Sequence, residues 1–413
     1  MQLADRFDKS PLADGIRRAL SESLERRKKE TVALQNVAVE RPDDIGEMMM
    51  MYVEVDNETK GPTGRSVSML DVEFEPLQYA DLLGKNLSGK VVIPLSWRNA
   101  RVLESSISEI PADRIVSGNA VLESDSSSLT IGLVKGGWLP SGLALQGNMI
   151  VMPDRCTISE LAGRFRDGAK RKAEDRDFLD LFADKPVRIN PLLYAIEGNL
   201  QRNPTPDVVE QQLDEACAKV SSALPMARLA PDRKGWLKGA VGLIQDSQAG
   251  MSRKQDFLIH LAPRVHAPVS AKRLPLLWQE VLSVADACDV PRLSLVVLAA
   301  LSAIAVPNGR SPAKRLLKLN QPNYSKELAY NALSDLRALD ILMSMLGAFP
   351  EQRLLLCTGD RDLALFWVGI RASHLQWRDG QLHFKLSPVE ELLPDITHDW
   401  LASSLCADAQ AND

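Results

Sequence analysis

The chain has 413 residues, of which 45% are hydrophobic, 25% are charged and 5% are aromatic. This length is enough for two or three folded domains, and the composition is typical of a soluble globular protein. The 49 basic and 54 acidic side chains give a formal net charge of −5. This balance excludes a protein that coats nucleic acid through its overall charge, although a local basic surface is compatible with it.

The cysteines and the apolar stretches indicate the compartment. The 5 cysteines are far apart and form no C-x-x-C pair. We therefore expect neither a disulfide framework nor a zinc site. The N-terminal residues contain no apolar run of signal-peptide length, and the longest apolar stretch, 293–306, is too short to span a bilayer. These patterns predict a cytoplasmic protein without membrane contact.

The first third of the chain is expected to form a domain of its own. Apolar residues at four-residue spacing predict an amphipathic helix over 12–34. Short apolar runs between Gly, Pro, Ser and Asn clusters then predict a strand-rich α+β domain over 1–147. The glycines of KGGWLPSGLALQGN, 135–148, lack the Lys-Ser/Thr ending of a phosphate-binding loop. We expect this segment to be a hinge between domains.

The remainder, 148–402, is expected to be an α/β domain followed by a disordered tail over 403–413. Strands that alternate with helices predict a parallel or mixed sheet with helical cover. The expected elements are a strand at 149–152, a mainly helical stretch at 157–346, a strand at 354–358, a helix through Trp367, strands near 375–377 and 382–386, and a last helix.

Two apolar strands of this domain end in acids. Asp154 follows MIVMP, Asp360 and Asp362 follow LLLCTG, and a helix is expected directly after each. Each acid alone is an ordinary helix N-cap. If the two strands are neighbours in a parallel sheet, however, their acids meet at one edge within reach of a metal ion. Oxygen ligands without His or Cys suit Mg²⁺ or Mn²⁺.

Asp335 and Asp340 are further candidates on one expected helix. Asp340 has Leu333, Leu336 and Met343 as helical neighbours. We therefore expect it to point the way the apolar residues point, where a charge needs a partner or a metal. Asp335 lies five residues earlier, about 140° round the helix, so only one of the two acids is expected to be a ligand.

Two glutamates complete the candidate set. Glu197 ends an apolar helical face just before Gly198, in INPLLYAIEGN. This position favours a metal ligand. Glu160 lies two turns into the helix after Asp154, where a surface position is the favoured interpretation.

Three segments resemble parts of the PIN-domain nucleases. MIVMPDRCTISEL resembles the family's opening strand and helix, with Asp154 in place of the first metal acid. INPLLYAIEGN is similar to its second acidic helix, which makes Glu197 the second acid. DILMSMLGAFPEQRLLLCTGDRDLALFW resembles the third-acid helix, the next strand and a Thr-x-Asp turn. Asp340 then becomes the third acid and Asp360 the fourth, with Asp362 beside it.

The resemblance covers about 148–200 and 325–386 and implies a PIN-like fold with a large helical insertion at about 201–325. It implies a metal-dependent endonuclease that acts in a toxin or defence role. RNA is the favoured substrate and DNA is the alternative. The expected catalytic metal ligands for Mg²⁺ or Mn²⁺ are Asp154, Glu197, Asp340 and Asp360, with Asp335, Asp362 and Glu160 as alternates or neighbours.

One departure from the family pattern supports an alternative function. Arg155 and Cys156 stand where the family has a small polar pair. A guanidinium beside the first acid would neutralise the pocket in place of a metal, which describes a non-catalytic adaptor for protein or nucleic acid. An acidic-cluster phosphatase is a weaker option, because no nucleophile motif is evident. No G-x-S-x-G motif supports acyl transfer either.

Two basic clusters flank the segments that resemble the family. If they border one cleft, they supply contacts to RNA phosphates and leave the acids for metal. The N-terminal domain and the insertion would then select the substrate or bind a regulatory protein partner, and an oligomer is compatible with the sequence. The clusters consist of Arg164, Arg166, Lys170, Arg171 and Lys172, and of Arg310, Lys314, Arg315 and Lys318.

Overall fold

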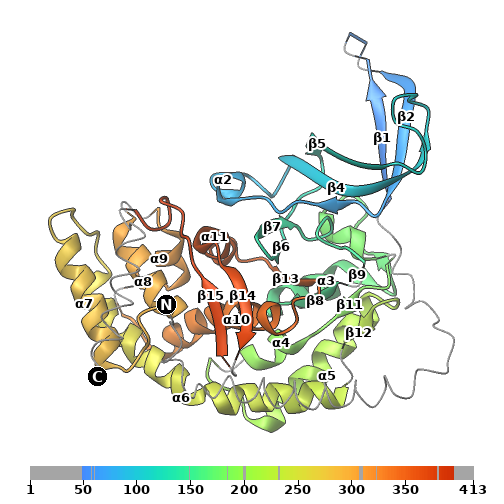
Figure 1. The fold of residues 1–413 in the computed structure, drawn as a ribbon. Coiled ribbons are helices and arrows are strands. Elements are labelled where there is room, and N and C mark those ends of the chain that lie inside the picture. Colours follow the sequence, from blue (N-terminus) through green and yellow to red (C-terminus); the bar gives the residue numbers. More distant parts are fainter. Residues whose placement is uncertain are drawn as a thin grey trace.

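The computed structural model describes residues 49–394 except 57, 60, 148, 184, 199–200, 231–232, 307–309, 322 and 379–380. The helix predicted over 12–34 and the tail over 403–413 lie outside these residues. The described chain is a mixed α/β protein whose main sheet combines parallel and antiparallel strands (Figure 1). In the described ranges, no helix combines the length and apolar character needed to cross a membrane.

The main sheet has the strand order β12-β11-β8-β13-β6-β7. β8 lies between β11 and β13 and is parallel to both, whereas β6 and β7 continue the sheet in antiparallel pairs. The central strands are short and almost entirely apolar, as expected for strands buried on both faces. The bounds are β6 (Ile131–Val134), β7 (Gly137–Pro140), β8 (Ile150–Pro153), β11 (Arg188–Ile189), β12 (Arg228–Leu229) and β13 (Leu354–Thr358).

The two acid-tipped strands are neighbours, as the sequence predicted. β8 pairs with β13 in parallel, with Ile150 opposite Leu354 and Pro153 opposite Cys357. The backbone N–H of Asp154 continues the ladder by donating to the carbonyl of Cys357 at 2.9 Å. Both strands therefore deliver their acids to the same edge of the sheet.

The main sheet continues across the domain boundary expected at residue 147. β6 and β7 form a tight hairpin whose turn contains Gly136 at φ +87°. A Cβ at Gly137 would lie 2.3 Å from the carbonyl oxygen of Leu77, and one at Gly142 would lie 2.0 Å from that of Phe178. Gly137 and Gly142 are thus required by close backbone packing inside the fold, and the segment is not a hinge between two domains.

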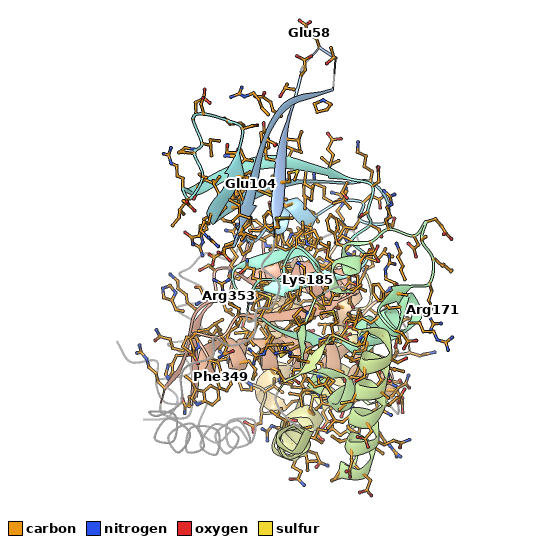
Figure 2. The ribbon with its side chains drawn as sticks, turned by 90° about the vertical axis from the view of Figure 1, so that its right-hand side faces the viewer. Glu58, Glu104, Arg171, Lys185, Phe349 and Arg353 are labelled. Carbon is orange, nitrogen blue, oxygen red and sulfur yellow. The ribbon has the colours of Figure 1, made fainter. Side chains whose placement is uncertain are left out.

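The N-terminal strands form a separate antiparallel sheet that projects from the body (Figure 1). Figure 2 shows Glu58 at the outer tip of its first hairpin and Arg353 near its base. Arg353 forms an ion pair with Glu73, and Arg361 donates to the carbonyl of Leu82 at 2.6 Å. These contacts fix the sheet to the body. Its elements are β1 (Met50–Val55), β2 (Pro62–Leu70), β3 (Glu73–Phe74), α2 (Tyr79–Leu82), β4 (Val91–Ser105) and β5 (Ile115–Ser124).

Helices make up most of the residues between β8 and β13, as predicted for the stretch 157–346. α10 packs against α6, β14 and β15, and it is buried round most of its circumference. The helices are α3 (Arg155–Arg164), η2 (Phe178–Phe182), α4 (Leu192–Glu197), α5 (Pro206–Ala223), α6 (Arg233–Val265), α7 (Leu274–Ala287), α8 (Leu295–Ala305), α9 (Pro312–Leu316), α10 (Lys326–Ala348) and α11 (Arg361–Ile370). The remaining strands are β9 (Phe165–Arg166), β10 (Ala169–Lys170), β14 (Ser373–Arg378) and β15 (Gln381–Lys385).

Candidate acidic site

The acids that follow β8 and β13 both cap helices. Oδ1 of Asp154 accepts the backbone N–H of Thr157 at 2.6 Å and so caps α3. Oδ1 of Asp360 accepts the N–H groups of Asp362 and Leu363 at 2.8 and 2.9 Å and so caps α11. Capping explains why the chain places acids here, and it also holds each carboxylate at the edge of the sheet.

Thr358 joins the two strand-end acids. Its hydroxyl hydrogen-bonds to the carboxylate of Asp154. Its Oγ1 also accepts the backbone N–H of Asp360 at 2.9 Å. Thr358 is fully buried, so these hydrogen bonds set the two acids side by side without competition from water.

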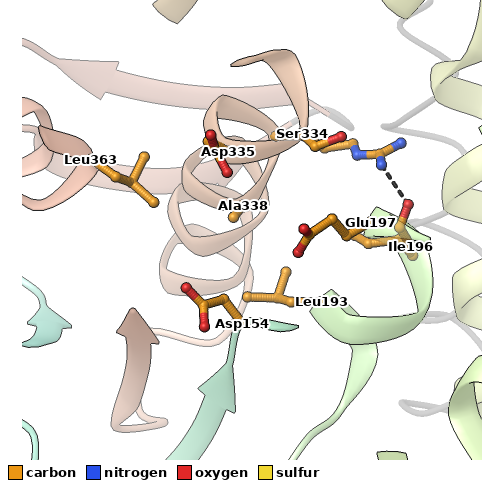
Figure 3. A pocket seen from close by; sticks show the side chains of 9 residues that line it. Asp154, Leu193, Ile196, Glu197, Ser334, Asp335, Ala338 and Leu363 are labelled. Carbon is orange, nitrogen blue, oxygen red and sulfur yellow. Dashed lines mark hydrogen bonds between the residues drawn. The ribbon is translucent and has the colours of Figure 1, made fainter. Parts of the chain in front are cut away.

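A small pocket lies beside this edge, and acids from three elements line it (Figure 3). Asp154 comes from the end of β8, Glu197 from the last residue of α4 and Asp335 from α10. Asp360 is close enough to raise the pKa of both Asp154 and Asp335. We call these four residues the acidic site. The other lining residues are Leu193, Ile196, Ser334, Arg337, Ala338 and Leu363.

All four carboxyls of the acidic site have raised pKa values. Burial is the largest cause at each of them. Burial, followed by the charge of Asp154, raises the pKa of Glu197 to about 7. Burial and then the charges of Asp360 and Glu197 hold the pKa of Asp335 well above its usual range. Binding of a cation or a proton therefore stabilises the site.

Asp340, the expected third acid, does not line this pocket. Its carboxylate accepts the Lys254 ammonium of α6 at 3.1 Å, and the two side chains are 26% and 24% exposed. Asp335 lines the pocket in its place. The apolar neighbours of Asp340 suggested that it faces the same interior space as they do. A helix that is buried on nearly all sides, however, has several inward faces.

Two other expected alternates also lie outside the acidic site. The carboxylate of Glu160 is 3.7 Å from Arg164, and its side chain is 47% exposed. Asp362 receives two hydrogen bonds from the guanidinium of Arg315, at 2.9 and 2.6 Å. The structure thus brings together Asp154, Glu197, Asp335 and Asp360 from the predicted set.

Arg155 does not fill the acidic site. Its guanidinium donates to Gln212 at 2.6 Å and lies 4.3 Å from the centre of the Tyr194 ring. Its backbone N–H, at the start of α3, hydrogen-bonds to the carboxylate of Glu197, and its charge also lowers the pKa of Glu197 against the larger effect of burial. In the described part of the chain, the Arg155 guanidinium thus acts on Glu197 through its charge while it is hydrogen-bonded to Gln212, and it does not fill the space between the acids as the adaptor alternative required.

The two predicted basic clusters have different surroundings. Arg164 and Lys170 both bind the carboxylate of Asp180, at 2.6 and 2.9 Å, so they are part of the internal structure. Lys318 follows α9 in a left-handed turn with φ +55°. Its charge lowers the pKa of Asp335 and Asp360 against the larger effect of burial. Lys318 is therefore the cluster member whose position next to the acidic site is best supported.

Two residues of α10 that sequence reasoning missed hold Glu197 in place. Arg337 is 5% exposed and donates to the carbonyl of Ile196. Tyr330 donates through its hydroxyl to the carbonyl of Glu197 at 3.1 Å. These bonds satisfy carbonyls at the end of α4 that have no intrahelical partner. In the sequence, the position of Arg337 among apolar residues of α10 was the signal that could have identified it as a buried, hydrogen-bonded side chain.

The arrangement is not a closed metal cage. Among the residues that the structure describes, no group of three or more His, Cys, Asp or Glu side chains is close enough to hold a metal ion. Comparisons of the chain with family models, with curated proteins and with solved structures find no match. The function must therefore be inferred from the site itself.

Proposed function

We propose that the chain is a metal-dependent endonuclease with a PIN-like catalytic domain, which hydrolyses phosphodiester bonds in RNA, with DNA as the alternative substrate. One observation carries the proposal. Four carboxylates from separate elements converge at the end of neighbouring parallel strands, where α/β proteins bind their ligands. The convergence includes Asp154, Glu197 and Asp360, which the resemblance also assigns to the site.

The donor set suits Mg²⁺ or Mn²⁺. All four donors are carboxylates, and hard divalent cations prefer such oxygens. Burial and mutual repulsion raise their pKa values, and a cation relieves this repulsion. Mg²⁺ commonly takes only one or two carboxylates and keeps several waters, so three preformed ligands are not required. Such an ion would supply Lewis-acid stabilisation of phosphate charge and would acidify water.

The order of the site segments supports a PIN-like domain. An acid-tipped strand opens α3, Glu197 ends α4, an acid on α10 precedes β13, and Asp360 opens α11. The resemblance to the PIN-domain nucleases implies acids in this order. We assign the third acid to Asp335 in place of Asp340, because Asp335 lines the pocket.

The proposal is tested by replacing both strand-end acids. We expect the Asp154→Asn, Asp360→Asn double variant to remain folded, because Asn caps a helix about as well as Asp. It should lose divalent-dependent cleavage of RNA by about 1,000-fold or more, as should the wild type in EDTA. Cleavage would be followed with a fluorescent RNA and folding by circular dichroism. Wild-type rates in the double variant would refute the assignment.

Lys318 should strengthen substrate binding. We expect Lys318→Met to raise KM for RNA about tenfold, because one phosphate contact near the acids is lost. The slope of log affinity against log salt concentration, which is negative, should become less steep by about 0.7. Lys326→Met, at an exposed lysine on the first turn of α10, is the matched control and should change neither value. Equal effects of the two substitutions would exclude a contact at Lys318.

A second candidate function is a non-catalytic adaptor built on the same fold. The lack of three preformed metal ligands among the described residues favours it. Titration with Mn²⁺ distinguishes the two functions. The nuclease binds Mn²⁺, and the double Asn variant loses that binding, whereas the adaptor binds no Mn²⁺ in either form.

A further inference from the structure

Two hydrogen-bond donors in the acidic pocket have no partner. The hydroxyl of Ser334 and the Nε of Arg337 are buried, and neither has a hydrogen-bond partner among the described residues. The two residues are 8% and 5% exposed, and both line the pocket that contains Asp154, Glu197 and Asp335. Buried donors are nearly always paired, so these two indicate a ligand or a water with acceptor oxygens.

The rest of the Arg337 guanidinium is held by protein. Nη1 donates to the side chain of Asn203 at 3.1 Å, and Nη2 donates to the carbonyl of Ile196 and to the hydroxyl of Tyr330. These contacts prevent the guanidinium from turning away to find another acceptor. The Nε–H therefore has a fixed position, which an incoming acceptor must approach.

A metal ion alone cannot satisfy both groups. The oxygen of Ser334 can bind a cation, but the Nε–H of Arg337 can only donate, and a cation accepts no hydrogen bond. The carboxylates and the donors that line this pocket thus favour opposite chemistry, a cation for the former and an acceptor oxygen for the latter. A phosphate ester accompanied by a divalent cation has both parts, because its oxygens accept hydrogen bonds while the cation contacts the acids.

We infer that Ser334 and Arg337 form a phosphate-oxygen site, in which these donors bind non-bridging oxygens of the substrate phosphodiester. The inference rests on the proposed function and extends it, because it names the residues that position the phosphate relative to the acids. Arg337 has two roles in it. It holds the end of α4 through Nη2 and contacts the phosphate through Nε.

Ser334→Ala is the informative substitution. It removes a hydroxyl that has no partner in the protein, so the melting temperature of the free protein should stay the same or rise. The control is Ser344→Ala on the same helix. Ser344 is 3% exposed, and its hydroxyl donates to the carbonyl of Asp340 at 2.8 Å, away from the pocket lining.

The probe is uridine 5′-monophosphate, which contains a phosphate but no bond for a nuclease to cleave. We would titrate it by calorimetry with and without Mn²⁺ and would follow the paramagnetic relaxation of its ³¹P signal. Ser334→Ala should weaken binding about tenfold and leave Mn²⁺ affinity unchanged, as expected for one lost hydrogen bond to an anion. Ser344→Ala should change neither affinity.

Three results would overturn the inference. The first is an equal nucleotide affinity of wild type and Ser334→Ala, which would assign the donors to a buried water. The second is equal weakening of nucleotide binding by both serine variants, and the third is a wild type that binds no nucleotide with or without Mn²⁺. A wild type that binds no Mn²⁺ would refute the metal-dependent function instead. If the wild type then binds nucleotide without Mn²⁺, weakening of that binding by Ser334→Ala would still support the phosphate site, because both donors belong to the protein whether or not a metal is bound.

Discussion

Asp335→Asn should reduce divalent-dependent RNA cleavage by about 1,000-fold, and Asp340→Asn should reduce it by less than about threefold. The physical reason is the environment of the two carboxylates. Asp335 lines the acidic pocket and interacts electrostatically with Asp360, Glu197 and Asp154. Asp340 forms an ion pair with Lys254 on the side of α10 that faces α6. The comparison requires kcat and KM from single-turnover and steady-state cleavage.

Stability serves as the control for this pair. Asp335→Asn removes a carboxyl whose charged form is disfavoured by burial and by the neighbouring acids, so the protein should unfold at the same or a higher temperature near neutral pH. Asp340→Asn leaves Lys254 without its anion, and a partly exposed ion pair contributes about 1 kcal/mol or less. A larger loss of activity in Asp340→Asn than in Asp335→Asn would support Asp340 as the third acid and contradict the assignment of Asp335 from the pocket.

The parallel placement of the two acid-tipped strands was predictable from the sequence. Each is a short apolar run followed by an acid and a helix, and such strands pair in the core of α/β proteins. Asp154 and Asp360 therefore follow from local pattern and one general rule of sheet topology. The same local pattern explains why both also cap helices, since one carboxylate has two oxygens.

The choice between Asp335 and Asp340 was not predictable in the same way. It depends on which neighbour each side of α10 meets, and the neighbours α4 and α6 are remote in sequence. The donors of Ser334 and Arg337 were missed for a related reason. An unpartnered polar atom can be recognised only after every residue that surrounds it is known.

The segment around β6 and β7 is a third feature that could not be predicted from the sequence. Its glycines suggested a hinge, because glycine marks both mobile turns and close packing. At Gly137 and Gly142 packing decides, since a Cβ would collide with the backbone of Leu77 and Phe178. These partners lie 60 and 36 positions away, so no local window contains the information.

In EDTA, the protein should lose stability as the pH rises from 5 to 8, and Mn²⁺ should restore it. Glu197 has a pKa of about 7 in the folded protein against an ordinary value of 4.5. A carboxyl whose pKa is raised by folding favours the folded state fully below 4.5, and this contribution is lost as the pH rises through 7. The loss from Glu197 alone would be about 2–3 kcal/mol. The pKa values of Asp154, Asp335 and Asp360 are raised too, so these groups act in the same direction.

Glu197→Gln isolates this contribution, because it removes the charge and keeps the shape of the side chain. The free energy of unfolding of the variant minus that of the wild type should increase between pH 5 and pH 8, when both are measured in urea with EDTA. Glu160→Gln, at an exposed carboxylate outside the acidic site, should show no such trend. Mn²⁺ should raise the melting temperature of the wild type more at pH 8 than at pH 5, because protons compete with the ion for the same oxygens. A difference between Glu197→Gln and wild type that does not change with pH would show that folding does not raise the pKa of this carboxyl.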